Sequence, residues 1–142
     1  MVDKTECLFC RIARKEFNAA IVYEDKAVIA FLDIRPATKK GGHTLVMPKQ
    51  HFELITDMPM AIINNVMSAV QKISKALLKD AEGVNLLQNN KRAAGQAIPH
   101  VHFHVIPRYQ NDGVNVEKWE INEYKPGEIE KATARIKNLL KD

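Results

Sequence analysis

Five short apolar segments, separated by polar or glycine-containing turns, run along this chain. They predict strands over residues 21–23, 27–32, 43–47, 84–87 and 98–106. The polar residues 24–26 join the first two segments, which is typical of a hairpin. The third segment follows a Gly41-Gly42 turn and is stopped by Pro48.

Three other stretches have the spacing of helices. Residues 8–16 suit a short helix with Leu8, Phe9 and Ile12 on one side, and residues 58–80 suit a longer one. Asp57 is the expected N-cap of the longer helix, and Gly83 lies just past its end. Its predicted buried face consists of Met60, Ile63, Met67, Val70, Ile73 and Leu77. A last helix, opened by residues 126–128, has Ile129, Ala132, Ile136 and Leu139 along its apolar side.

The order of these elements favours an α+β fold. Strands mostly pair with their sequence neighbours, so we expect a five-stranded antiparallel sheet with two main helices packed against it. The sequence contains no repeat, low-complexity segment or interdomain linker. Residues 1–142 are therefore expected to form a single domain.

Composition and charge narrow the class of protein. The 142 residues carry a formal net charge of +4, which favours anionic ligands without selecting one. Nucleic acid is a disfavoured partner, because basic and acidic residues are mixed after residue 118 rather than segregated. The longest apolar run, residues 27–32, is too short to cross a membrane, and residues 1–6 do not resemble a secretion signal. We expect a cytoplasmic protein.

The fifth predicted strand contains His100, His102 and His104 at alternate positions. Side chains alternate between the faces of a strand, so the three imidazoles are predicted to share one face. Val101, Phe103 and Val105 then face the core. A polar outer face that happens to be rich in histidine is the less favoured interpretation.

Two kinds of chemistry use imidazoles in a row. A metal site is one, but His100 and His104 would lie about 13 Å apart in a strand, so all three could bind one ion only with strain. Covalent catalysis at phosphorus is the other, and His102, flanked on both sides, is the natural nucleophile. The turn at Gly95 and Gln96 can offer backbone N–H groups to phosphate oxygens.

The triad, preceded by Gly95-Gln96 and by the segment 42–49 (GHTLVMPK), resembles the histidine triad (HIT) superfamily of nucleotide hydrolases and nucleotidyl transferases. The resemblance covers about residues 5 to 110. It implies a homodimer with a five-stranded antiparallel sheet. It also implies cleavage at the α-phosphorus of a purine nucleotide conjugate, either a nucleoside phosphoramidate or a dinucleoside polyphosphate, through a nucleotidyl-histidine.

The resemblance also assigns roles to single residues. His102 matches the nucleophile, His104 the member that contacts the phosphate and helps to protonate the leaving group, and His43 a supporting histidine. Asp33 matches the carboxylate that binds the ribose hydroxyls, which suits an acceptor of two hydrogen bonds. The residues matched to the base and phosphate positions are Phe9, Ile12 and Phe17 around the base, and Asn89, Gly95, Gln96 and Ala97 near the phosphate.

One departure bears on catalysis. Many relatives have Ser or Thr where this chain has Ala97, so one hydroxyl contact to the phosphate is missing. A nucleotide-binding or signalling protein with little turnover is therefore kept as a second hypothesis. A nucleic-acid-binding module is a third, and it is disfavoured by the lack of clustered aromatic residues.

Cys7 and Cys10 have the C-x-x-C spacing shared by zinc half-sites and redox pairs. A redox pair normally follows a strand, and too few residues precede Cys7 to form one. The remaining ligands of a zinc site would be histidine or carboxylate, with His51 and His100 as candidates. Zinc-bearing microbial HIT proteins use a C-x-x-C with two histidines that match His51 and His100. The resemblance thus implies a structural zinc.

Overall fold

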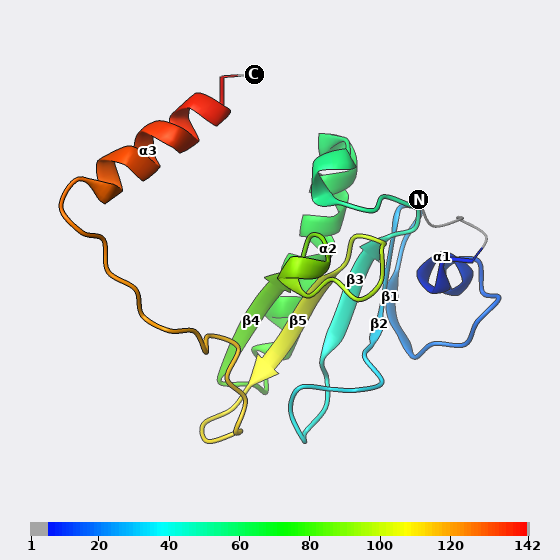
Figure 1. Cartoon of the computed structure of the whole chain (residues 1–142). Coiled ribbons are helices and arrows are strands. Elements are labelled where there is room, and N and C mark those ends of the chain that lie inside the picture. Colours follow the sequence, from blue (N-terminus) through cyan, green and yellow to red (C-terminus); the bar gives the residue numbers. More distant parts are fainter. Residues whose placement is uncertain (1–5, 142) are drawn as a thin grey trace.

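The computed structural model describes residues 6–141, so residues 1–5 of the expected non-signal N-terminus lie outside the described part. Five strands form one antiparallel sheet in the order β1-β2-β3-β5-β4. The strands are β1 (Ile21–Glu24), β2 (Val28–Leu32), β3 (Thr44–Pro48), β4 (Gly83–Gln88) and β5 (Phe103–Arg108). The helices are α1 (Leu8–Ala13), α2 (Met60–Leu77) and α3 (Glu128–Leu139), with short 3-10 turns η1 (Ile55–Asp57) and η2 (Arg92–Ala94). This architecture confirms the predicted α+β fold (Figure 1).

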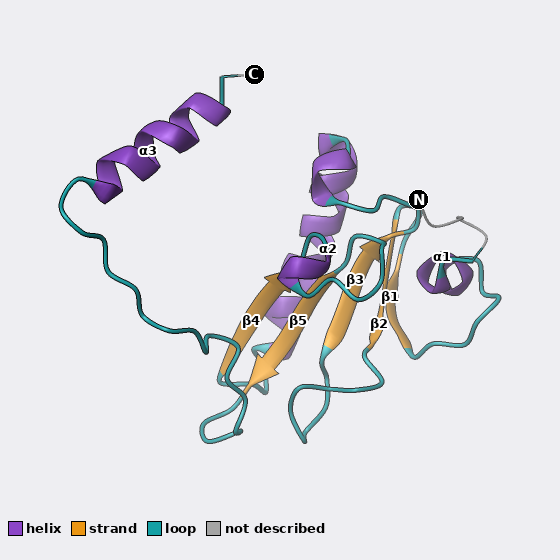
Figure 2. Ribbon diagram, in the orientation of Figure 1, coloured by secondary structure: helices purple, strands orange, loops and turns teal. Residues whose placement is uncertain are grey.

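One face of the sheet packs against α2, which runs between β3 and β4 along the chain (Figure 2). Val28 and Val46 on the sheet meet Val66 and Val70 on α2, and all four are almost fully buried. Val105 joins the same cluster from β5. The alternation predicted for residues 101, 103 and 105 therefore holds.

The other face packs against α1 on its β2 and β3 side. Ile29 and Met47 are fully buried there against Phe9 of α1. Because both faces of β2 and β3 are covered, these strands are nearly continuous apolar runs. Leu45 of β3 pairs with His104 of β5, which places His104 on this second face.

The fifth strand begins later than the sequence predicts. The expected strand was 98–106, but β5 starts at Phe103, and His100 and His102 lie in the segment that leads into it. Pro99 has no N–H to donate, and the His100 amide donates to the Ile98 carbonyl at 2.8 Å, closing a tight turn. The three histidines therefore do not all lie within the strand, but their side chains still share the α1 side of the sheet, because His100 and His102 both pack against Phe9.

The long helix is shorter than predicted, and two residues of its predicted buried face are exposed. It starts at Met60 with Pro59 as N-cap, and Asp57 instead caps the preceding turn by accepting from the Leu54 amide at 3.1 Å. Its buried residues are Val66, Ala69, Val70 and Ile73, whereas Met60 and Met67, both predicted to be buried, are exposed. The predicted face is right for Ile63, Val70, Ile73 and Leu77, which belong to the core cluster or pack against it, and wrong only for the two methionines.

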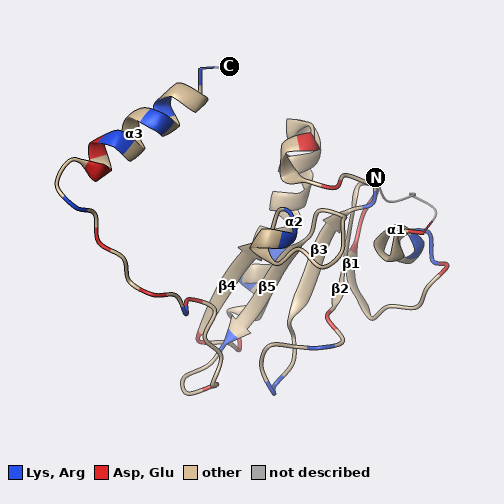
Figure 3. Cartoon of the chain, viewed as in Figure 1, with Lys and Arg blue, Asp and Glu red and all other residues tan. Residues whose placement is uncertain are grey.

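The last helix forms where expected but has no buried residue. Figure 1 shows α3 at the end of a long connection, away from the sheet. Lys, Arg, Asp and Glu lie along this connection, α3 and the loops, with both signs interspersed (Figure 3). Among the described residues, the helices lack the length and hydropathy needed to span a membrane.

Candidate active site and metal centre

A pocket of about 400 Å³ lies on the face of the sheet opposite α2. Apolar side chains from α1, β2 and β3 form most of its wall, and Asn18, Asp33, Arg35, His102 and His104 supply polar groups. Seven of the predicted site residues line it: Phe9, Ile12, Phe17, Asp33, Ala97, His102 and His104. An apolar cleft with a few convergent polar groups is the usual form of a small-molecule site.

Several lining residues were not predicted from the sequence. They are Leu8, Asn18, Ala19, Phe31, Leu32, Ile34, Arg35, Leu45 and Ile98. Leu8, Phe31 and Leu45 read as core residues in the sequence, because a pocket wall and a core have the same apolar pattern. Asn18, Ala19 and Arg35 lie in connecting segments, where the sequence has no periodic signal.

The backbone of His100 sets the orientation of the His102 ring. Its Nδ1 lies 2.7 Å from the carbonyl oxygen of His100. A carbonyl can only accept, so Nδ1 carries the proton and Nε2 has the free electron pair. Phe9 packs edge-on against the ring with centroids 5.0 Å apart. The imidazole is thereby fixed in the tautomer that a nucleophile requires.

His43 extends the histidine group from the start of β3. Its Nε2 lies 2.9 Å from Nδ1 of His104 and 3.8 Å from Oδ2 of Asp33. His43 is not itself a lining residue of the pocket but stands behind His104, as a supporting histidine would. The rings of His102 and His104 are 5.0 Å apart. Three imidazoles and one carboxylate thus form a connected group.

Burial keeps these imidazoles neutral. It lowers the pKa of His104 to about 4, with the neighbouring His102 and His43 adding to the effect. Burial also lowers the pKa of His102 and of His43, against the opposing influence of Asp33 on both. At neutral pH each ring therefore has one N–H and one free electron pair.

The loop between β4 and β5 carries the residues matched to the phosphate position. The Gln96 side chain accepts from the Lys91 amide at 2.7 Å and donates to the Glu53 carbonyl at 2.7 Å, so it braces the loop. Gly95 has a φ of +86°, and a Cβ there would lie 3.6 Å from the Asn89 amide nitrogen. Asn89, Gly95 and Gln96 are not lining residues of the pocket, whereas Ala97 is.

A second cluster lies next to the triad. Cys7, Cys10, His51 and His100 place one ligand atom each within 4.8 Å of all the others. Nδ1 of His100 is 3.6 Å from both sulfur atoms, and Nδ1 of His51 is 3.3 Å from Sγ of Cys10. Both thiols are free of a disulfide and buried.

These distances fit a tetrahedral metal site. Zn–S and Zn–N bonds of about 2.3 and 2.05 Å place sulfur and nitrogen about 3.6 Å apart. Nε2 of His100 lies 2.8 Å from the Pro48 carbonyl, which fixes the proton on Nε2 and leaves Nδ1 free to bind. The residues present can therefore hold a metal ion with a Cys2His2 donor set.

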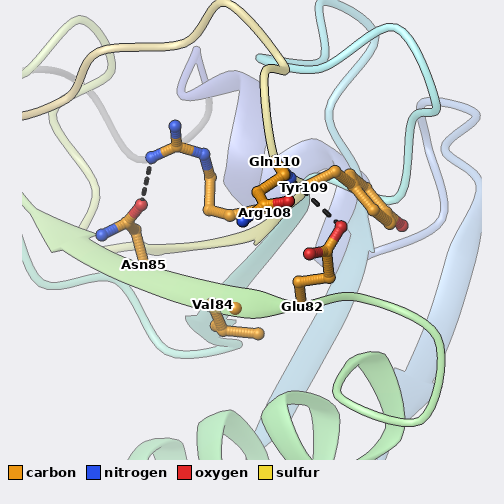
Figure 4. Close-up of a pocket in the computed structure, with 7 residues that line it drawn as sticks. Glu82, Val84, Asn85, Arg108, Tyr109 and Gln110 are labelled. Atoms are coloured by element: carbon orange, nitrogen blue, oxygen red, sulfur yellow. Dashed lines mark hydrogen bonds between the residues drawn. The ribbon is translucent and has the colours of Figure 1, made fainter.

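Another hollow, lined by Glu82, Gly83, Val84, Asn85, Arg108, Tyr109 and Gln110, is formed by β4 and the end of β5 (Figure 4). Arg108 donates to Asn85 at 2.6 Å and to the Asp112 carboxylate at 2.8 and 3.0 Å. Glu82 accepts from the Gln110 amide. Since these polar groups are paired with one another, this hollow is a structural feature of the sheet end.

The fold and the histidine group define a histidine triad protein, and comparison with known proteins agrees. The HIT domain family model matches residues 14–111. An uncharacterised HIT-like protein of Methanocaldococcus jannaschii is 47% identical over 116 residues, covering 81% of this chain and 88% of that protein. Protein hit of Bacillus subtilis is 41% identical over 138 residues, covering 94% of each. The chain belongs to the HIT family.

Solved structures show the same fold. The crystal structure of a HIT family member from Bacillus subtilis matches with a TM-score of 0.84 and 38% identity, covering 94% of this chain and 96% of that one. A zinc-bound histidine triad protein from Mycobacterium smegmatis has a TM-score of 0.74 and 32% identity, covering 96% of this chain and 99% of that one.

Among relatives found by sequence, an adenosine 5′-monophosphoramidase of Saccharomyces cerevisiae is 35% identical over 117 residues, covering 82% of this chain and 72% of that protein.

Proposed function

We propose that the protein is a hydrolase or nucleotidyl transferase acting at the α-phosphorus of a purine nucleotide conjugate, a nucleoside phosphoramidate or a dinucleoside polyphosphate. The observation that carries this proposal is the fixed tautomer of His102 in a pocket that also contains Asp33 and His104. The phosphoramidase activity named for the yeast relative is consistent with it. Cys7 and Cys10 are buried and form no disulfide, which suits a reducing cytoplasm, the location we propose.

The reaction proceeds in two displacements. Nε2 of His102 attacks the α-phosphorus, and the bond from phosphorus to the leaving nitrogen or oxygen breaks, its electron pair remaining on the leaving group. His104 gives a proton to that group. Water, or another acceptor, then attacks the nucleotidyl-histidine and returns a proton to His104. His102 is released unchanged.

The rest of the pocket positions the nucleotide. Phe9, Ile12 and Phe17 give an apolar surface for the base, and Asp33 has a carboxylate that can accept from both ribose hydroxyls. The side chain of Asp33 is 21% exposed, so it is accessible from the pocket. Asn89, Gly95, Gln96 and the amide of Ala97 belong to the loop that faces the phosphate.

A second candidate is a nucleotide-binding protein with little turnover. Ala97 lines the pocket but has no hydroxyl to donate to a phosphate oxygen. Loss of one such donor weakens stabilisation of the charge that develops on phosphorus, without weakening base or ribose binding. A binder of this kind would form no covalent adduct, which separates the two candidates experimentally.

For the metal centre, we propose zinc bound by Cys7, Cys10, His51 and His100. When bound, zinc supplies a closed four-ligand crosslink and no open position for substrate or water. It would connect the start of α1, the segment after β3 that contains His51, and the segment that contains His100 and His102. The zinc-bound relative from Mycobacterium smegmatis supports a zinc site in this fold.

We further propose a homodimer. Ile129, Ile136 and Leu139 of α3 are more than half exposed, and Leu86 of β4 is 51% exposed. Within residues 6–141, β4 is an edge strand with one neighbour. Apolar surface of this extent is typical of a protein interface, and a second copy would cover it.

Replacing His102 by Ala should abolish turnover, because Nε2 of His102 is the proposed nucleophile, whereas the free electron pair of His104 is on Nδ1, beside His43. His102→Gly with added imidazole should recover part of the rate. The measurement is a rapid-quench burst with an α-labelled substrate, in which wild type accumulates labelled protein. A His102→Ala enzyme that keeps more than about a tenth of the rate would exclude His102 as nucleophile.

Asp33→Ala should raise KM and leave kcat little changed, since ribose contacts are made equally in the ground and transition states. Loss of a charged hydrogen-bonding group predicts an increase in KM of about 10- to 100-fold. Steady-state kinetics with ribo- and 2′,3′-dideoxynucleotide substrates measure it. If the dideoxy substrate binds wild type as well as the ribonucleotide does, Asp33 is not the ribose acceptor.

The purified protein should contain about one zinc per chain. Because metal binding is linked to folding, a strong chelator or Cys10→Ser should lower the melting temperature by several degrees before it changes the chemistry at His102. Elemental analysis and a thermal scan measure this. Metal-free protein from a chelator-free preparation, or a Cys7–Cys10 disulfide that cycles with thioredoxin, would contradict the assignment.

The double variant Ile129→Glu and Ile136→Glu should convert the dimer to a monomer, because it places charges on the apolar side of α3. Lys131→Glu, on the opposite side of the helix, is the control and changes the net charge by the same amount. Light scattering coupled to size exclusion measures the mass. A wild-type protein that is monomeric at high concentration would disprove the dimer.

A further inference from the structure

A backbone amide reaches the histidine group from outside the triad. The N–H of Ala37, in the loop between β2 and β3, donates to Nδ1 of His43 at 3.1 Å. A backbone N–H can only donate, so Nδ1 of His43 must be the accepting, unprotonated nitrogen. His43 is neutral because burial lowers its pKa. Its single proton therefore lies on Nε2.

That proton determines the next ring. Nε2 of His43 lies 2.9 Å from Nδ1 of His104, and since Nε2 is the donor, Nδ1 of His104 must accept. The neutral His104 then carries its own proton on Nε2. The order of donors runs from the Ala37 amide through His43 to His104, and each step follows from the one before it.

We propose that the Ala37 amide is a positioning group that fixes His104 as a proton donor at Nε2. This inference rests on the proposed function, in which His104 protonates the leaving group. His102 is fixed in the opposite sense, because the His100 carbonyl holds its proton on Nδ1. One backbone acceptor and one backbone donor thus give two neighbouring imidazoles opposite tautomers, one a nucleophile and the other an acid.

The loop is built to hold this amide in place. The Asp33 amide donates to the His43 carbonyl at 2.8 Å, which closes the two ends of the loop. Oδ1 of Asp33 accepts from the Arg35 amide at 2.8 Å, and Pro36 fixes φ just before Ala37. Thr38 is 2% exposed and accepts at its carbonyl from the Gly41 amide at 3.0 Å. The same loop therefore orients Asp33 and His43.

The amide has a second consequence. Asp33, His43 and His104 offer ligand atoms within 4.8 Å of one another, close enough for a metal ion. A metal would need the electron pair on Nε2 of His43, but that nitrogen is protonated while Nδ1 accepts from Ala37. Binding would require the imidazolate of His43 or loss of the amide hydrogen bond. The Ala37 hydrogen bond therefore opposes metal binding by Asp33, His43 and His104 and leaves His43 and His104 available for proton transfer.

The tautomers can be observed directly in the zinc-loaded wild-type protein. Long-range ¹H–¹⁵N correlation spectra of protein with ¹⁵N-labelled histidine rings distinguish protonated from unprotonated ring nitrogens. We expect protonated Nε2 on His43 and His104 and protonated Nδ1 on His102. His43→Gln and His104→Asn spectra assign the signals. A protonated Nδ1 on His43 or His104 at neutral pH overturns the proposal, whatever the enzyme's activity.

The functional test removes only the N–H. Replacing the Pro36–Ala37 amide by an ester, with lactic acid in place of Ala37, keeps the side chain and deletes the donor, whereas Ala37→Gly keeps the donor. With a phosphoramidate, whose amine leaving group needs a proton, the ester protein should lose about fivefold in kcat, the value of one neutral hydrogen bond. With a p-nitrophenyl nucleotide ester, whose leaving group needs no proton, the rate should stay unchanged.

Added Zn²⁺ gives an independent readout. Above one equivalent, it should inhibit the ester protein by binding Asp33, His43 and His104, and at the same concentration leave wild type and Ala37→Gly active. Equal losses with both leaving groups, or equal inhibition of all three proteins, would show that the amide is merely structural. Absence of turnover in wild type would refute the proposed function, while the tautomer spectra would still decide this inference.

Discussion

The interaction on which the rest of the site depends is the set of hydrogen bonds made by His100. Its ring nitrogen Nε2 donates to the Pro48 carbonyl at 2.8 Å, its Nδ1 faces Cys7 and Cys10 at 3.6 Å, and its own carbonyl accepts from His102 at 2.7 Å. The residue is fully buried, so each polar group needs a partner. In the described part of the chain, buried side-chain nitrogen and oxygen atoms all have one. A shift of His100 would therefore disturb the Cys7–Cys10–His51–His100 cluster and His102 together.

This arrangement explains why two apparently separate motifs occur in one short chain. Cys7 and Cys10 lie at the start of α1, and the histidine triad leads into β5. His100 belongs to the triad and also to the cluster formed with the cysteines. Phe9, placed between Cys7 and Cys10 on α1, packs against the rings of His100 and His102 at centroid distances of 6.0 and 5.0 Å. A metal bound by these cysteines would thus also hold a wall of the pocket that contains His102 in place. Rigid support of this kind is what a preorganised site requires.

Much of this could be predicted from residue patterns, and the exceptions have physical causes. Short apolar segments bounded by turns predicted the strands, alternation predicted the two faces around residues 101–105, and the C-x-x-C spacing indicated the metal cluster. The start of β5 was missed since Pro99 and a turn at His100 override the β-branched pattern around them. Met67 was wrongly placed on the buried face of α2, because it fits a helical stripe as well as Val66 does. The role of Ala37 has no signal in the side chain, since a backbone amide is the same in any residue except proline.

The lowered pKa values of the buried imidazoles determine which protonation states the proposed mechanism can use. Burial lowers the pKa of His104 to about 4, so at neutral pH the rings cannot be told apart by charge. Acid and nucleophile must then differ by which nitrogen holds the proton, and only a neighbouring hydrogen-bonding group can set that. In this structure the His100 carbonyl contacts His102 directly, and the Ala37 amide reaches His104 through the His43 side chain. The chemistry of the triad is therefore specified by the path of the main chain around it, through a turn before β5 and a closed loop after β2.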